Sequence, residues 1–391
     1  MTQVTSDDIT VAWGSQPSSI EAQTGRWRQA VFQDVQESSD GKCLYFLYDP
    51  IADERARTTG GYRKGSNCIL VFDLTLRCLT QEIPLSVPGN LKFLFALRPL
   101  IVGGETRAIV VSETISGGGA KQLHFTLLNV STLQHITMTR PLDVGHDYIC
   151  TIREDAPELI VMANPGLQVW RLAAEVMEPT TPIDYFRVDG AQLNHFYDGF
   201  ICGGVILLVS ANPDHTLDYT RVHLLDMQTR SLTTSGCSAD PKRGFPVPRL
   251  QAGIVVLAGF LIVCGGESTF GRGVERLRDY WRLDLTSFQW HQCMGEMPVP
   301  LIEPRITITY GGHVYLWGDW DGSLPGVRRG MTHLRIIRVD GLDAPPGYEM
   351  PAPVPPIGLT DRQQDPPPPY TENNYVPPPE EKKKKKCCTV L

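Results

Sequence analysis

The chain has 391 residues, 42% of them hydrophobic, and a formal net charge of −7 at pH 7. This length suffices for one large folded domain and a tail. Its longest uncharged apolar run, residues 252–264, is too short to cross a bilayer as a helix, and its start lacks the basic region and apolar core of a secretory signal. Short β-rich runs alternate with turn residues and helical periodicity is rare, so we expect an all-β fold.

The first predicted element is an isolated strand at residues 8–13, followed by a polar link over residues 14–26. Beyond it the chain repeats one frame: an apolar residue, usually followed by Asp or Asn, with another bulky residue seven positions after the apolar one. A repeat of this length forms a small sheet that needs neighbours of its own kind to bury both faces. The frame recurs at Phe72/Leu79, Leu128/His135, Trp170/Met177, Leu225/Leu232 and Leu283/Trp290, and it begins again at Val339.

The clearest copy spans residues 251–293. Two apolar runs end in Gly265-Gly266; a polar loop follows, then a third run with Leu283 and Asp284, and a fourth around Trp290. This order of four short strands resembles a kelch repeat, in which Gly-Gly ends the second strand and a Trp follows the Asp. Kelch repeats build β-propellers, so the resemblance implies a ring of such sheets.

We therefore expect a six-bladed kelch-type β-propeller over residues 1–344. The strand at residues 8–13 would complete the last blade, because that blade lacks a fourth strand after Val339. Pairing the two ends in this way closes the ring and leaves no open sheet edge. The expected blades cover residues 27–82, 92–138, 147–180, 191–234, 250–293 and, with the N-terminal strand, 305–340.

Nothing in the sequence predicts a catalytic residue, a metal site or a cofactor. No pair of cysteines in the propeller region forms a C-x-x-C motif, so we expect reduced, buried thiols in a cytosolic protein. The histidines form no H-E-x-x-H cluster, and there is no G-x-S-x-G elbow or phosphate-binding glycine loop. Kelch-type propellers include copper oxidases similar to galactose oxidase, so an oxidase-like propeller, with His146, or His313 and His333, as imaginable ligands, remains the alternative.

Three long loops, residues 49–67, 266–279 and 318–331, are expected to join second and third strands and so to share one face. Their charges nearly balance, which does not fit a nucleic-acid footprint. Arginine is enriched in protein interfaces, so we expect a protein partner here, with ordinary solvated loops as the alternative. The candidate partner residues are Arg55, Arg57, Arg272, Arg276, Arg328 and Arg329.

Residues 345–379 are rich in proline and poor in apolar mass, so we expect an extended, disordered tail. Pro367, Pro368 and Tyr370 form a P-P-x-Y motif that resembles the ligand of WW domains, whose groove takes a polyproline II helix. This resemblance implies a WW-domain partner such as a HECT-type ubiquitin ligase. Residues 353–356 offer a weaker P-x-x-P motif for Src-homology-3 domains.

Residues 380–391 combine a run of lysines with two cysteines near the C-terminus. Cys388-Thr389-Val390-Leu391 resembles a prenylation box, and a final leucine implies a geranylgeranyl group on Cys388. Cys387 is a candidate for palmitate. The lysines would add attraction to an anionic bilayer: Lys382, Lys383, Lys384, Lys385 and Lys386.

The last three residues with a free carboxylate would also fit a PDZ domain, but processing of a prenylation box removes them. The sequence thus predicts a non-enzymatic, monomeric adaptor at the cytoplasmic face of a membrane, with a cytosolic pool. Its propeller would bind one protein, its tail would recruit a WW-domain protein, and neither would bind nucleic acid.

Overall fold

The structure is a computed structural model of the chain. It describes residues 3–8, 32–38, 41–49, 67–76, 78–97, 107–137, 140–153, 158–174, 182–269, 273–308, 314–320 and 331–339. All of them belong to one unit of the chain, residues 1–353. Within these ranges, no helix is long and apolar enough to cross a membrane.

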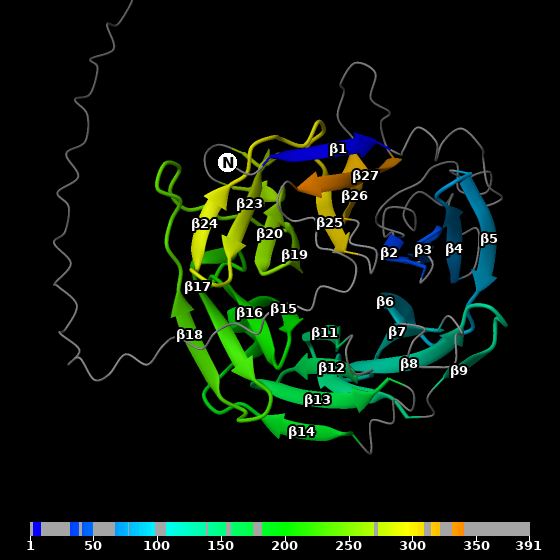
Figure 1. Ribbon diagram of the computed structural model, residues 1–391. Helices are drawn as coiled ribbons and strands as arrows, with labels where there is room; N and C mark the ends of the chain where they lie inside the picture. Colours follow the sequence, from blue (N-terminus) through cyan, green and yellow to red (C-terminus); the bar gives the residue numbers. More distant parts are fainter. Residues whose placement is uncertain are drawn as a thin grey trace, which may run out of the picture. The chain divides into compact units, whose positions relative to one another are not determined.

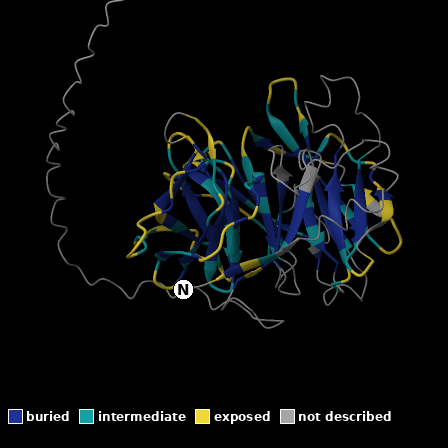
Figure 2. Ribbon diagram, turned by 90° about the horizontal axis from the view of Figure 1, so that it is seen from above, coloured by how far each residue is buried: buried dark blue, intermediate teal, exposed yellow. Residues whose placement is uncertain are grey.

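The described residues form a six-bladed β-propeller, as the repeated frame predicts. Six antiparallel sheets surround a central axis. In five of them the first strand lies at the centre and the last at the rim; in blade six β25 lies at the centre and the N-terminal strand β1 at the rim (Figure 1). The short connections at the ends of the strands are mostly exposed, whereas most strand residues are buried or partly buried (Figure 2). A single turn of 3-10 helix, η3 (Leu193–His195), precedes the fourth blade.

The strands of the first three blades are as follows: blade one has β2 (Phe32–Glu37), β3 (Cys43–Tyr48), β4 (Cys68–Asp73) and β5 (Cys78–Pro84); blade two has β6 (Asn90–Leu97), β7 (Arg107–Ile115), β8 (Lys121–Asn129), β9 (His135–Thr137) and β10 (Leu142–Gly145); blade three has β11 (Tyr148–Arg153), β12 (Glu158–Ala163), β13 (Gln168–Ala173) and β14 (Asp184–Arg187).

The remaining strands are as follows: blade four has β15 (Phe196–Cys202), β16 (Val205–Ala211), β17 (Leu217–Asp226) and β18 (Leu232–Gly236); blade five has β19 (Gly253–Leu257), β20 (Phe260–Cys264), β23 (Tyr280–Asp284) and β24 (Gln289–Gln292), with a side ribbon of β21 (Glu267–Ser268) and β22 (Glu275–Arg276); blade six has β25 (Ile302–Ile308), β26 (Val314–Trp320), β27 (Met331–Val339) and β1 (Val4–Asp8).

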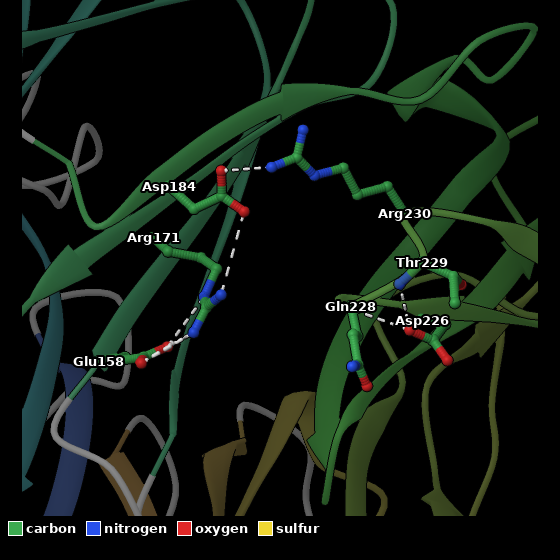
Figure 3. Close-up of polar contacts among 7 residues, drawn as sticks. All are labelled: Glu158, Arg171, Asp184, Asp226, Gln228, Thr229 and Arg230. Carbon is green, nitrogen blue, oxygen red and sulfur yellow. Dashed lines mark hydrogen bonds and ion pairs between the residues drawn. The ribbon is translucent and has the colours of Figure 1, made fainter.

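The two bulky residues of the frame, seven positions apart, lie directly opposite each other across the hairpin between the third and fourth strands. Leu225 lies opposite Leu232, and the equivalent pairs are Phe72/Leu79, Leu128/His135 and Leu283/Trp290. The Asp after the apolar residue closes the turn: Asp226 Oδ1 accepts the backbone N–H groups of Gln228 and Thr229, both at 2.8 Å (Figure 3). Asp73, Asn129 and Asp284 accept the same two bonds in their hairpins.

Blade three departs from the frame, and the expected end of this blade at residue 180 is wrong. Trp170 lies opposite Tyr185 rather than Met177, and β14 begins only at Asp184. The frame has Arg171 where the other hairpins have Asp or Asn, so the tight turn lacks its acceptor and the connection is longer. Arg171 instead donates to Glu158, with Nη2 2.7 Å from Oε2 (Figure 3).

The ring closes as predicted, although with different residues. The strand that completes blade six is Val4–Asp8, not residues 8–13, of which only Asp8 is described. Val4 is buried in one apolar cluster with Val339, and its N–H donates to the carbonyl of Met294 at 2.8 Å. These contacts select the earlier segment, although residues 10–13 are more apolar in sequence.

Blade two also has one strand more than expected, because β9 and β10 both pair with β8. β10 lies beyond the expected end of the blade at residue 138. Its Leu142 and Val144 are buried against blade three, and this burial explains why the chain returns to the sheet.

Apolar clusters lie between neighbouring blades and form the core of the domain. The cysteines whose side chains are described form no disulfide. Five of them are buried, as expected, whereas Cys43 and Cys237 are only partly buried. Burial raises the pKa of both Cys202 and Cys264 to about 12, so these thiols stay protonated and unreactive at neutral pH.

Candidate protein-interaction face

The connections between second and third strands lie on one face of the propeller, because every blade runs its strands in the same order from centre to rim. We call this the long-loop face. Of the six arginines proposed for it, only Arg276 is described. Arg276 lies on β22, with Nε 3.2 Å from Oε1 of Glu267 on β21, so its charge already has a partner.

The other sequence-predicted site residues lie outside the described residues. They are Arg55, Arg57, Arg272, Arg328 and Arg329 of the loops, Pro367, Pro368 and Tyr370 of the tail, Lys382, Lys383, Lys384, Lys385 and Lys386, and Cys387 and Cys388.

An ion pair between a buried arginine and a partly exposed aspartate holds the base of the long loop in blade five. Arg249 is fully buried and donates from Nη1 and Nη2 to the two carboxylate oxygens of Asp279, at 2.6 and 3.0 Å. Trp281 Nε1 also donates to Asp279, at 2.6 Å. Gly266 is required beside this pair, because a Cβ there would lie 2.7 Å from the carbonyl oxygen of Leu250. The Gly-Gly pair of the repeat therefore allows the backbone at Gly266 to pass close to Leu250 and Ala252, which follow Arg249 in the chain.

A second set of polar side chains gathers where blades two and three meet the long-loop face. Glu113, near the end of β7, is almost fully buried, with 5% of its side chain exposed. Tyr148 at the start of β11 donates its hydroxyl to Glu113 Oε2 at 2.7 Å. Burial, reinforced by this bond, raises the pKa of Tyr148, so the phenol remains a neutral donor.

Two lysines share the same carboxylate. Lys92 Nζ lies 3.8 Å from Glu113 Oε1, and Lys121 Nζ lies 3.6 Å from Oε2. The lysine side chains are 32% and 31% exposed, so solvent and partners can reach them. One carboxylate cannot neutralise two ammonium groups, and each ammonium carries three N–H donors. The group formed by Lys92, Glu113, Lys121 and Tyr148, which we call the lysine pair site, therefore has one positive charge to offer an acidic ligand.

Aromatic rings flank the lysine pair site. Phe93 packs edge to face against Tyr148, with ring centroids 6.2 Å apart, and Lys121 Nζ lies 5.5 Å from the centre of the Tyr148 ring. A register shift between Leu91 and Phe93 interrupts the ladder at Lys92. Such a bulge redirects side chains at a sheet edge, and it occurs here on the innermost strand of the blade.

Sequence reasoning missed this site. Its members come from four strands of two blades and occupy no common position in the repeated frame. Only Glu113 and Lys121 are close in sequence, on either side of the Gly117–Gly119 turn, and that turn carried no sign of a function.

Two carboxyl groups on the innermost strands of other blades have raised pKa values. Burial raises the pKa of Asp34 on β2 and of Asp198 on β15 to about 6 in each case. Asp34 Oδ2 accepts the N–H of Leu94 in the neighbouring blade at 2.9 Å. This bond and the positive charge of nearby Arg305 partly offset the rise in the pKa of Asp34. Asp198 accepts the N–H of Gly199 at 2.8 Å.

Among the described residues, no group of three His, Cys, Asp or Glu side chains could hold a metal ion. His146 is exposed and His333 is buried on β27, whereas His313 lies outside the described residues.

No family model matches the chain. Kelch domain-containing protein 10 of Homo sapiens is 28% identical to it over 98 residues, which is 25% of this chain and 21% of the human protein. The same protein of Rattus norvegicus is 28% identical over 98 residues, covering 23% of its own length, and that of Xenopus laevis is 26% identical over 98 residues. The match thus spans less than a quarter of these relatives.

Among solved structures, the one titled "Structure of YjhT" aligns with a TM-score of 0.48 and 9% identity, covering 80% of this chain and 98% of that one. The six-bladed ring and the local similarity to kelch-domain proteins support a propeller of the kelch type.

Proposed function

We propose that the protein is a non-enzymatic adaptor: its propeller binds one protein partner, and its tail holds that complex at a membrane beside a WW-domain protein. The lysine pair site is the observation that carries the propeller part of this proposal. It combines unbalanced positive charge with aromatic surface on one rigid face. Aromatic residues are enriched in protein interfaces, and complementary charge steers the right partner to the site.

The partner that fits this site has an acidic side chain next to an apolar one. Lys92 and Lys121 would bind the carboxylate, and Phe93 with Tyr148 would contact the apolar neighbour. Burial of Glu113 beneath the lysines holds them in place, so little side-chain entropy is lost when the partner binds.

The tail supplies the second half of the adaptor. The P-P-x-Y motif ending at Tyr370 would occupy a WW domain, with HECT-type ubiquitin ligases as the implied class of partner. Geranylgeranyl on Cys388 would insert into the cytoplasmic leaflet, and Lys382–Lys386 would add attraction to anionic lipids. A single lipid chain binds membranes only marginally, so the two signals together are needed for a stable membrane pool.

An affinity pull-down with the full chain tests the propeller part. The variant Lys92→Ala/Lys121→Ala should lose the propeller's partner while keeping the WW-domain protein, and Tyr370→Ala should show the reverse. The matched control Arg140→Ala/Arg187→Ala removes two positive charges elsewhere and should lose neither. If the lysine variant and the control retain the same proteins, the lysine pair site is not the docking point. Metal content of the purified protein then discriminates the adaptor from an oxidase-like propeller.

A further inference from the structure

The connection from β18 to β19 follows the outer edge of blade five (Figure 1). Ser238 donates to the carbonyl of Phe288 at 2.8 Å and accepts from the N–H of Trp290 at 2.9 Å. Two residues further along the same edge of β24, the backbone N–H of Gln292 donates to Asp240 Oδ2 at 3.0 Å. The connection therefore pairs with the edge of β24 before it turns away, and this pairing fixes where the turn begins.

The turn itself is closed by its own backbone and one carboxylate. Asp240 and Gly244 exchange both backbone hydrogen bonds, at 3.0 and 2.9 Å. Asp240 Oδ1 accepts the N–H groups of Lys242 and Arg243 at 2.8 and 3.0 Å. Gly244 has a φ of +78°, which a side chain would disfavour. After the turn, the buried Arg249 donates from Nε to the carbonyl of Val247 at 3.0 Å and holds the far end. We call residues 240–247 the rim turn.

The rim turn presents charge and apolar surface together. All residues from 241 to 245 are exposed, so the tip of the turn projects into solvent. Phe245 is 40% exposed and Val247 is 42% exposed. Within the described part of the chain, the side chains of Lys242 and Arg243 have no ion pair. A rigid turn thus carries two unpaired cations next to a Phe and a Val.

We propose that the rim turn is a membrane contact. Lys242 and Arg243 bind anionic lipid headgroups, and Phe245 and Val247 enter the boundary between headgroups and acyl chains. Basic residues beside aromatic and aliphatic ones are the composition that binds anionic bilayer surfaces. A projecting, exposed tip favours a bilayer over an acidic peptide, because peptides dock in grooves whose walls supply most of the contact.

The inference deepens the proposed lipid anchor and rests on it. A prenyl chain and five lysines hold the chain near the bilayer, so a second, weak contact becomes an intramolecular event with a high effective concentration. With both contacts engaged, the propeller has a preferred orientation on the membrane, whereas the tail alone would leave it free to turn.

Vesicle binding by the unlipidated full chain tests the contact apart from the anchor. Purified Cys388→Ser protein is mixed with phosphatidylcholine vesicles, with or without phosphatidylserine, at low salt. Each basic residue near an anionic surface changes partitioning about fivefold, so Lys242→Glu/Arg243→Glu should lower binding to the acidic vesicles by about 25-fold or more. The control Arg140→Glu/Arg187→Glu changes the net charge equally and should lower it much less.

A second measurement tests the apolar residues of the rim turn. Phe245→Trp should add fluorescence that shifts to the blue with acidic vesicles, while Phe245→Ser should weaken binding about fivefold. Equal partitioning of the charge-reversed rim turn and its control, or an unshifted emission from the Phe245→Trp variant, would overturn the membrane contact. If the rim-turn variant instead loses a protein partner but no vesicle binding, the turn is a protein contact. Localisation of Cys388→Ser in cells reports on the lipid anchor independently.

Discussion

Val4, close to the start of the chain, lies directly opposite Val339 in the last described strand. Four more pairs follow along β1 and β27, ending at Asp8 and Arg335. Arg335 Nε also donates to Ser6 Oγ at 3.0 Å. The two ends of the domain are thus joined within one sheet, so the stability of blade six depends on residues from both.

Deletion of residues 1–8 should therefore destabilise the whole domain. The deletion exposes the edge of β27 and removes Val4 from the cluster between blades five and six. We expect a loss of about 3 kcal/mol or more in the free energy of unfolding, measured by urea denaturation. Thr5→Ser, at an exposed position of the same strand, serves as the control and should change little. An unchanged urea midpoint in the deletion would show that β1 does not close the ring in solution.

Arg249→Ala should destabilise the propeller strongly. The substitution leaves the Asp279 carboxylate without its two guanidinium bonds and leaves a void where a fully buried side chain stood. Breaking a buried pair by removing one partner costs about 3–5 kcal/mol, and we expect the lower end of this range because the Asp279 side chain is 21% exposed. Arg276→Ala removes a half-exposed arginine from the same loop and should cost less than about 1 kcal/mol. Equal melting temperatures for the two variants would contradict this account.

Stability should fall as pH rises from about 4 to about 6, because of Asp34 and Asp198. Burial raises the pKa of both carboxyl groups to about 6 in the folded state, above the value of about 4 for an unfolded chain. In this window the folded state binds more protons than the unfolded state, so raising the pH favours unfolding. Asp198→Asn should flatten this decline and stabilise the protein at pH 7.5 by up to about 3 kcal/mol. The exposed Asp189→Asn is the control; a parallel pH profile in both variants would refute the assignment.

Cys388→Ser should move the protein from membranes to the cytosol. The remaining lysines act through a field that salt screens within about 10 Å, so they cannot replace the lipid. Cell fractionation or fluorescence imaging measures the shift. Neutralising Lys382–Lys386 while keeping Cys388 should weaken attachment only in part. Full membrane retention by Cys388→Ser would mean that Cys388 does not carry the anchor.

Tyr370→Ala should abolish binding to WW domains while leaving membrane attachment and the melting temperature unchanged. The tyrosine fills a pocket of its own beside the proline groove, so its loss removes a principal anchor of the peptide. Isothermal titration with an isolated WW domain measures the effect, and Tyr375→Ala in the same tail is the matched control. Normal binding by the Tyr370 variant would reduce the motif to a spacer.

The local sequence pattern determined the hairpins that build the blades of this protein. An apolar residue, an Asp or Asn, and a bulky residue seven positions after the first suffice to specify a hairpin, because the carboxylate closes the turn and the two bulky residues then face each other. Asp226 with Leu225 and Leu232 shows this relationship. The missing fourth strand after Val339 predicted ring closure for the same reason, since an unpaired edge strand needs a partner.

The tertiary structure alone decided which segment closes the ring and where charge gathers. Val4–Asp8 prevails over the more apolar residues 10–13 because Val4 reaches a cluster built by blades five and six. Lys92, Glu113, Lys121 and Tyr148 meet only because blades two and three pack side by side, and no spacing along the chain encodes their distances. Repeats determine contacts within a blade, which are local in sequence. Contacts between blades depend on side chains outside the repeated frame, and these become neighbours only once the ring has formed.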